Sequence, residues 1–232
     1  MILAIDVGNT NIVFGGIEDG KQLFSVRLAS DRNKTADQYA LDIQGILTMQ
    51  KIRPEEIEGG ILSSVVPYLQ TVIPQAVKSL TGIDLMVVGP GIKTGLNIRM
   101  DNPGTVGSDL IVAAVAARAK YPAPLAIIDM GTATTLSVIA ENGSYVGGMI
   151  IPGLWVSVNA LSAKAAQLPY IDLAGPTKLL GTNTVDCMRA GAVNPLMFVV
   201  LLVGVQGLVE WLTGCVVGGG VAKAVAHALK RE

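Results

Sequence analysis

The sequence predicts an α/β fold made of two related halves, each with a mixed sheet. The first observation is an internal repeat: residues 5–11 (IDVGNTN) resemble residues 128–134 (IDMGTAT). Each copy reads as strand, glycine turn, strand, turn, strand. Helical patterns then follow each copy, as is typical of α/β proteins. Three pairs of residues share an offset of 123 positions: Asp6 and Asp129, Gly8 and Gly131, Gly20 and Gly143.

We therefore expect a first domain over residues 1–119 and a second over 120–232. In the first, apolar runs predict strands over 2–5, 12–17 and 22–28. Thr35 and Gln38 form the pattern of a capping box, which predicts a helix from there to about Gln50. The apolar residues of that helix fall on one face and are Tyr39, Ile43, Ile46 and Leu47.

The remaining elements follow from the same signals. A short helix is expected from Pro54, a helix over 67–80 with a kink at Pro74, and a helix through Lys120 that Ser108 would cap. Strands are expected over 60–65, 85–88, 125–128, 136–140 and 145–150. Further helices are expected over 156–167, 185–192 and 193–212.

The composition favours a globular protein and argues against nucleic-acid-binding and membrane proteins. Half of the 232 residues are hydrophobic and only 15% are charged, so the chain folds around a core. A net charge of −1 argues against nucleic acid or an anionic membrane as a partner. The longest apolar run, Leu196–Val205, is too short for a membrane helix of about 20 residues. The two cysteines, Cys187 and Cys215, form no CxxC pair and are expected to be reduced. No signal peptide is expected either, so we predict that the protein is cytoplasmic.

The repeated motif suits a phosphate ligand. A glycine turn lets a phosphate approach the backbone closely, and nearby amides and hydroxyls can donate to its oxygens. The aspartate beside each turn suits a hard cation such as Mg²⁺. Two such turns facing each other would hold a triphosphate and its metal. A single copy would be equally consistent with an ordinary hairpin turn, and the repeat favours the phosphate site. The polar side chains available for this are those of Asn9, Thr10, Asn11, Thr132, Thr134 and Thr135.

Asp109 is the candidate base for phosphoryl transfer. It falls in the first turn of a predicted helix, where the helix dipole favours an ionised carboxylate. Acidic residues also occupy first turns for stability alone, and position by itself does not separate the two roles. The chain has one histidine, His227, which argues against a Ser-His-Asp triad and a histidine-rich zinc site.

These residues resemble the type III pantothenate kinase family of the acetate and sugar kinase/Hsp70/actin superfamily. The resemblance implies duplicated actin-like (ribonuclease H-like) halves with a nucleotide cleft between them. It runs from Met1 to about Gly191. The matching segments are MILAIDVGNTNIVFGG at 1–16, TADQYA at 35–40, SSVVP at 63–67, GPGIKTG at 89–95, DNPGTVGSD at 101–109, IIDMGTATT at 127–135, GGMIIPG at 147–153, AAQLP at 165–169 and GTNTVDCM at 181–188.

The resemblance implies phosphorylation of pantothenate by ATP, the first step of coenzyme A synthesis, in a homodimer. Asp109 would be the proton acceptor, Asp6 would serve Mg²⁺, and Asp129 would bind a monovalent cation, K⁺ or NH₄⁺. The residues implied to contact ATP are Asp6, Val7, Gly8, Asn9, Thr10, Asn11, Ile12, Val13 and Thr132. The positions implied to contact pantothenate are Met100, Gly107, Ser108, Asp109, Leu110 and Thr184.

Two of those positions depart from the family pattern. Leu110 stands where the family has an arginine for the substrate carboxylate, and Met100 stands where it has a tyrosine. The C-terminal part is expected to be shortened, which bears on the adenosine side. Arg99, Lys93 and Arg189 are candidates for the missing cation. Two alternatives follow: a paralogue that binds a nucleotide or partner without turnover, and a kinase of another hydroxylated substrate.

Overall fold

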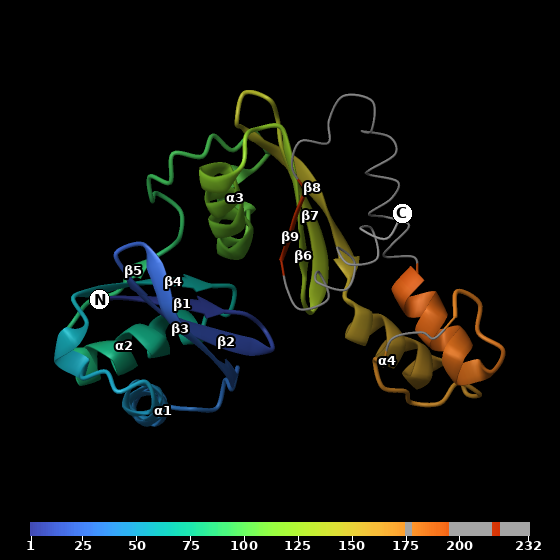
Figure 1. Ribbon diagram of the computed structural model, residues 1–232, viewed down its shortest axis with the longest axis horizontal. Coiled ribbons are helices and arrows are strands. Elements are labelled where there is room, and N and C mark those ends of the chain that lie inside the picture. The colour runs from blue at the N-terminus through green and yellow to red at the C-terminus, as the bar shows by residue number, and fades with distance from the viewer. Residues whose placement is uncertain (175–177, 195–214, 219–232) are drawn as a thin grey trace. The chain divides into compact units, whose positions relative to one another are not determined.

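The computed structural model describes residues 1–174, 178–194 and 215–218 (Figure 1). The chain forms two compact units, one of Met1–Thr94 with Gly104–Val112 and one of Gly95–Pro103 with Ala113–Glu232. Each unit contains one mixed sheet, as the repeat predicts. The run Leu196–Val205, most of the helix predicted over 193–212, and His227 lie outside the described residues.

The first unit contains a five-stranded sheet of order β3-β2-β1-β4-β5. β1 pairs antiparallel with β2 and parallel with β4, so it lies at the centre of the sheet. The three strands of the first repeat are confirmed. The strands are β1 (Ile2–Val7), β2 (Asn11–Glu18), β3 (Lys21–Ala29), β4 (Gly59–Ser64) and the short β5 (Met86–Val87).

Two helices lie against one face of this sheet (Figure 1). The first, α1 (Ala36–Met49), has both hydrogen bonds of the predicted capping box between Thr35 and Gln38. Its buried residues are the four that the sequence predicts. The second, α2 (Leu69–Thr81), contains Pro74 and ends at Gly82, whose φ of 75° suits glycine. A 3-10 turn, η1 (Pro54–Glu56), precedes β4.

The alternation of β1 decides what faces the helices and what faces away. Leu3, Ile5 and Val7 are buried in the core with α1 and α2. Because successive side chains of a strand point to opposite faces, Ala4 and Asp6 lie on the other face. The carboxylate of Asp6 is exposed there.

The second unit repeats this arrangement with a sheet of order β8-β7-β6-β9. β6 (Leu125–Met130) pairs antiparallel with β7 (Ala133–Ile139) and parallel with β9 (Cys215–Gly218), as β1 does with β2 and β4. β8 (Tyr145–Pro152) forms the edge. α4 (Leu154–Lys164) and a helical stretch over residues 184–194 follow.

The two copies differ by one residue in each of their first two turns. The turn after β1 holds residues 8–10, whereas the turn after β6 holds residues 131–132. The next connection compensates, with four residues between the paired Ile17 and Gln22 and five between Ile139 and Tyr145. Both third strands then carry one unpaired extra residue, Leu23 in β3 and Val146 in β8.

A long segment connects the two sheets and contains η2 (Pro103–Thr105) and α3 (Ser108–Lys120). The prediction that Ser108 caps α3 is wrong, because the helix begins at Ser108 and its hydroxyl donates to the Ser64 carbonyl at 3.1 Å. Gly107 instead accepts the first helical bond, from the Ile111 amide. Among residues 1–174, 178–194 and 215–218, no helix has the length and apolarity that crossing a membrane requires.

Candidate active site

The first glycine turn connects β1 to β2 beside Asp6. The Gly8 amide donates to the Asn11 carbonyl at 2.9 Å and closes the turn. Asp6, Asn9, Thr10 and Asn11 are exposed. Of the predicted ATP contacts, Val7 and Ile12 have fully buried side chains, so only their backbone groups could contact a ligand, while Val13 is half-buried.

Hydroxyl groups of β4 hold the start of α3 beside this turn. Ser63 lies in register with Asp6 on the neighbouring parallel strand and is 5% exposed. Its hydroxyl lies 3.2 Å from the hydroxyl of Ser108, which also donates to the Ser64 carbonyl. Asp109 follows directly, so the β4 hydrogen bonds position the candidate base near the strand that carries Asp6.

The carboxylate of Asp109 packs over a glycine. Its Oδ1 accepts a hydrogen bond from the Leu110 amide at 2.9 Å. A Cβ added at Gly107 would lie 2.4 Å from the same oxygen, well inside van der Waals contact. Gly107 therefore keeps open the space that the Asp109 carboxylate occupies. Asp109 and Leu110 are both half-buried.

A hollow of about 240 Å³ lies on the face of the first sheet that carries Asp6. Asp6 and Ser63 border it, and Val112 from α3 borders it as well. Its other polar side chains, Gln22 and Ser25, come from β3. The remaining lining residues are apolar or glycine and are Ala4, Ile5, Val13, Gly15, Ile17, Ile61 and Val88. The hollow therefore offers a carboxylate and hydroxyls at the border of an apolar surface.

The loop between β3 and α1 borders the first turn. The Ser30 amide donates to the Thr10 carbonyl at 2.9 Å, and its hydroxyl donates to the Gly8 carbonyl at 2.6 Å. Arg32 Nη2 donates to Asn9 Oδ1 at 3.0 Å. The turn thus has an arginine beside it that the sequence analysis does not select.

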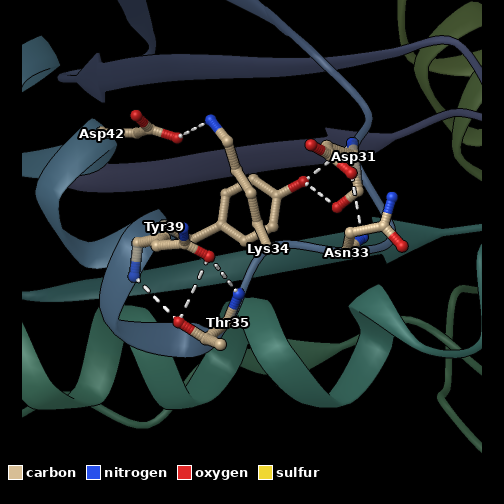
Figure 2. A network of polar contacts seen from close by, with 7 residues as sticks. Asp31, Asn33, Lys34, Thr35, Tyr39 and Asp42 are labelled. Carbon is tan, nitrogen blue, oxygen red and sulfur yellow. Dashed lines mark hydrogen bonds and ion pairs between the residues drawn. The ribbon is translucent and has the colours of Figure 1, made fainter.

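A buried tyrosine holds the same loop from the side of α1 (Figure 2). The Tyr39 hydroxyl accepts from the Asp31 amide at 3.0 Å and donates to the Asp31 carbonyl at 2.8 Å. Burial raises the pKa of Tyr39 above its ordinary value. Lys34 lies over the Tyr39 ring, and its hydrogen bond to Asp42, at 2.7 Å, raises the pKa of the lysine.

The second glycine turn belongs to the second unit. Asp129 and Thr132 are exposed around it, and the Gly131 amide donates to the Ala133 carbonyl at 3.0 Å. Gly153 packs against this turn, because an added Cβ would lie 2.2 Å from the Gly131 carbonyl oxygen. No side chain larger than hydrogen fits at Gly153 without moving the turn.

The predicted site residues fall into two groups. The structure places Asp6–Val13 and Gly107–Leu110 in the first unit. Asp129, Thr132, Met100 and Thr184 belong to the second. Within the second unit, Met100 is 38% exposed and Thr184 is exposed at the start of the helical stretch 184–194.

The exposed carboxylate of Asp6 suits the divalent cation that the sequence suggests. Within the described ranges, no three His, Cys, Asp or Glu residues gather to form a metal cage. Mg²⁺ in kinase sites is held by one or two carboxylates together with phosphate oxygens and water. An exposed carboxylate beside a glycine turn, as at Asp6, fits that pattern.

One candidate for the missing cation is already paired. The Arg189 guanidinium contacts the carboxylates of Asp172 and Asp186. Its hydrogen bond to Asp172 lowers the pKa of that carboxyl. Two carboxylates thus already offset the charge of Arg189. This disfavours Arg189 as the cation that binds the carboxylate of the substrate.

Sequence reasoning did not select Ser63 and Ser64 for the site. In the sequence, these serines are typical of the end of an ordinary β-strand. Ser63 and Ser64 precede their contact partner, Ser108, by 45 and 44 residues, so no local pattern joins them. The parallel pairing of β1 with β4 is the signal that could have brought them beside Asp6.

Comparison with known proteins supports one family. A family model described as type III pantothenate kinase matches residues 2–203. A type III pantothenate kinase from Moorella thermoacetica is 47% identical over 191 residues, which cover 82% of this chain and 75% of the relative. The corresponding protein from Halalkalibacterium halodurans is 45% identical over the same shares.

Solved structures share the fold at low sequence identity. A candidate 2-dehydro-3-deoxygalactonokinase from Sinorhizobium meliloti has a TM-score of 0.58 at 14% identity, covering 98% of this chain and 89% of its own. A candidate N-acetylmannosamine kinase from Listeria monocytogenes has a TM-score of 0.52 at 12% identity, covering 99% and 88%. The predicted α/β fold with duplicated actin-like halves is confirmed.

Proposed function

The chain belongs to the type III pantothenate kinase family, and we propose that Asp109 is the base with which it carries out the reaction. The chain is an enzyme that phosphorylates pantothenate with ATP, in coenzyme A biosynthesis. The resemblance drawn from the sequence is confirmed. No similarity favours the alternatives of a non-catalytic paralogue or of another substrate.

Phosphoryl transfer from ATP to pantothenate requires that the two substrates be held in position and that one group accept the alcohol proton. The alcohol oxygen of pantothenate attacks the terminal phosphorus of ATP, and the bond from that phosphorus to the bridging oxygen breaks. Asp109 accepts the alcohol proton, which later passes to water, and the products are ADP and 4'-phosphopantothenate. The contact that carries this assignment is the hydrogen bond from Ser108 to β4, because it positions Asp109 near the strand of Asp6.

The ligand contacts follow the family pattern as proposals. Residues 6–13 and Thr132 would contact ATP. Asp6 would hold Mg²⁺, which offsets the charge of the triphosphate when it is bound, and Asp129 would hold K⁺ or NH₄⁺. The homodimer and the cytoplasmic location are proposed on the same ground. The pantothenate contacts would be Met100, Gly107, Ser108, Asp109, Leu110 and Thr184.

A turnover assay tests the role of Asp109. The full chain is given ATP, Mg²⁺ and K⁺, with or without pantothenate, and ADP release is followed. Asp109→Asn keeps the size of the side chain but removes the proton acceptor, so kcat should fall by about 10²–10⁴-fold. The matched control is Asp37→Asn, an exposed acid in the first turn of α1.

Three outcomes of this assay distinguish the hypotheses about the base and about the function. Pantothenate-dependent turnover that is lost in Asp109→Asn and kept in Asp37→Asn supports the proposal. Full activity of Asp109→Asn would overturn the assignment of the base. Nucleotide binding without any pantothenate-dependent turnover would overturn the function itself.

A further inference from the structure

Arg32 is placed against the first glycine turn by hydrogen bonds of the two residues that precede it. Ser30 is bonded to the Gly8 and Thr10 carbonyls, and Asp31 is held by the Tyr39 hydroxyl through both of its backbone groups (Figure 2). Tyr39 is fully buried and therefore provides a fixed anchor. The backbone that carries Arg32 is thus set in position before any ligand binds.

Among the described residues, no carboxylate pairs with the charge of Arg32. Its Nη2 donates to the neutral oxygen of Asn9, and within the part of the chain that the structure describes it forms no salt bridge. The neighbouring Lys34 differs, because Asp42 accepts from it at 2.7 Å. A guanidinium has five N–H donors, so Arg32 retains donors beyond the one that Asn9 uses.

The surroundings of Arg32 favour an anion. Its side chain is exposed and touches a turn whose own residues, Asn9 and Thr10, are exposed. Arginine binds phosphate through charge-assisted hydrogen bonds that are about twice as strong as neutral ones. A preformed loop, an exposed arginine bonded to a neutral amide and a glycine turn together form a surface that is complementary to a polyphosphate.

We propose that Arg32 is a nucleotide-binding residue that contacts a phosphate oxygen of ATP at the first glycine turn. The proposal rests on the proposed function, in which residues 6–13 hold the triphosphate. It extends that site to the loop between β3 and α1, which the motif does not include. Asn9 then has a second role, which is to orient the guanidinium toward the turn.

Binding of a non-hydrolysable ATP analogue tests the proposal. Calorimetry with the Mg²⁺ complex of the imido analogue of ATP would compare the full-length wild-type chain with Arg32→Gln and Arg32→Lys. Loss of a charge-assisted bond should raise Kd by about 10–100-fold in Arg32→Gln. Arg32→Lys should keep part of the affinity, because it keeps the charge but not the planar fork.

Two controls separate a phosphate contact from a structural role. Arg53→Gln removes an exposed arginine that pairs with Glu56 and precedes β4, at the opposite end of the parallel strands from the turn, and should leave Kd unchanged. Adenosine lacks phosphates, so its weak binding should be equal in wild type and Arg32→Gln. The salt dependence of analogue binding should also become shallower in Arg32→Gln, because one charge contact is lost.

The outcomes distinguish this proposal from the proposed function. A wild-type Kd in Arg32→Gln, or an equal loss of adenosine and analogue binding, would overturn the role of Arg32 and leave the kinase assignment standing. If the wild type binds the analogue but shows no pantothenate-dependent turnover, the proposed function fails, and the Kd values still decide the role of Arg32. A wild type that does not bind the analogue overturns both.

Discussion

Gly107 lies so close to the Asp109 carboxylate that the two residues cannot be changed independently. An added methyl group would meet the flexible end of Asp109, at 2.4 Å, and not the backbone. The side chain can rotate away at low energetic cost, but it would then leave the position from which we propose that it accepts the proton. Substitution at Gly107 is therefore a way to move the proposed base without unfolding the protein.

We expect Gly107→Ala to lower kcat by at least about 10-fold, because misplacing a catalytic group by an ångström has effects of that size or larger. Thermal stability should change little. The contrasting variant is Gly153→Ala, whose new methyl group would collide with backbone carbonyls and should reduce stability as well. Steady-state kinetics and thermal melts measure both effects, and wild-type kcat in Gly107→Ala would contradict the expected crowding.

A substitution at Leu110 tests how the carboxylate of pantothenate is bound. If position 110 contacts pantothenate as we propose, an arginine there would provide a charge-assisted bond to the substrate carboxylate, worth about 1.5–3 kcal/mol. Leu110→Arg should therefore lower the KM for pantothenate by roughly 10–150-fold, with little change in the KM for ATP. Leu110→Gln introduces a polar side chain that is shorter than arginine and carries no charge, and it should not reproduce the gain. An unchanged KM in Leu110→Arg would mean that another group already binds the carboxylate.

Among the elements, α1 and the loop before it show how far local signals reach. Thr35 and Gln38 lie three residues apart and their pattern predicts both the helix start and its buried face, because a capping box involves only neighbours in sequence. The loop contacts of Ser30 and Arg32 could not be predicted in this way. They join residues 22 and 23 positions apart, which only strand pairing brings together.

The start of α3 shows the same limit. Ser108 has the residue type and position of a cap, yet its hydroxyl donates to the Ser64 carbonyl on β4. A side chain that can bond to its own helix can equally bond to a neighbouring strand. Which partner it chooses depends on the distance between two elements, and that distance is not encoded within a few residues of sequence.

Tyr39, in α1, makes the stability of the folded protein depend on pH. Burial raises the pKa of Tyr39 above the usual value of about 10, so the folded state favours the protonated phenol. That contribution to stability is fully present below about pH 10 and is lost as pH rises through the folded pKa. The pKa of Lys34 is raised too, by its bond to Asp42, and acts in the same direction at high pH.

We expect Tyr39→Phe to lower the free energy of unfolding by about 1–3 kcal/mol at pH 8, because the Asp31 amide and carbonyl lose their partner. The variant should also lose less stability than the wild type between about pH 9 and pH 11, since it lacks the phenol. The main cause of the Lys34 shift, its hydrogen bond to Asp42, is common to both proteins, and that part cancels in the comparison. Urea unfolding at each pH measures the difference, and parallel curves for the two proteins would argue against a role for Tyr39 in the pH dependence.

At the scale of the whole molecule, the duplication could be predicted because Asp6, Gly8 and Gly20 each recur after 123 residues. The difference between the two copies could not. The turn at residues 131–132 is one residue shorter than its counterpart, and the next connection is one residue longer. The two changes cancel in the sequence offset, so only the strand pairing shows them.

Two segments of the chain should also differ in local stability. Among the described residues, β1 belongs to a cluster of 19 buried apolar residues, whereas the cluster around α4 contains Val158, Ile171 and Met188. Amides opened by local unfolding exchange first where few apolar contacts oppose the opening. Hydrogen exchange measured by mass spectrometry should therefore show slow exchange over Ile2–Val7 and faster exchange over Leu154–Lys164. Equal protection of the two segments would contradict this order.

The extra residue on each third strand determines which of the side chains beyond it face inward. Leu23 and Val146 stand at the same offset as the repeated aspartates, and each reverses the inward and outward alternation of its strand. Removing either extra residue would exchange the inward-facing and outward-facing side chains over the rest of its strand. Both halves therefore depend on an extra residue at the same place in the repeat, whereas the turns between their strands differ in length by one residue.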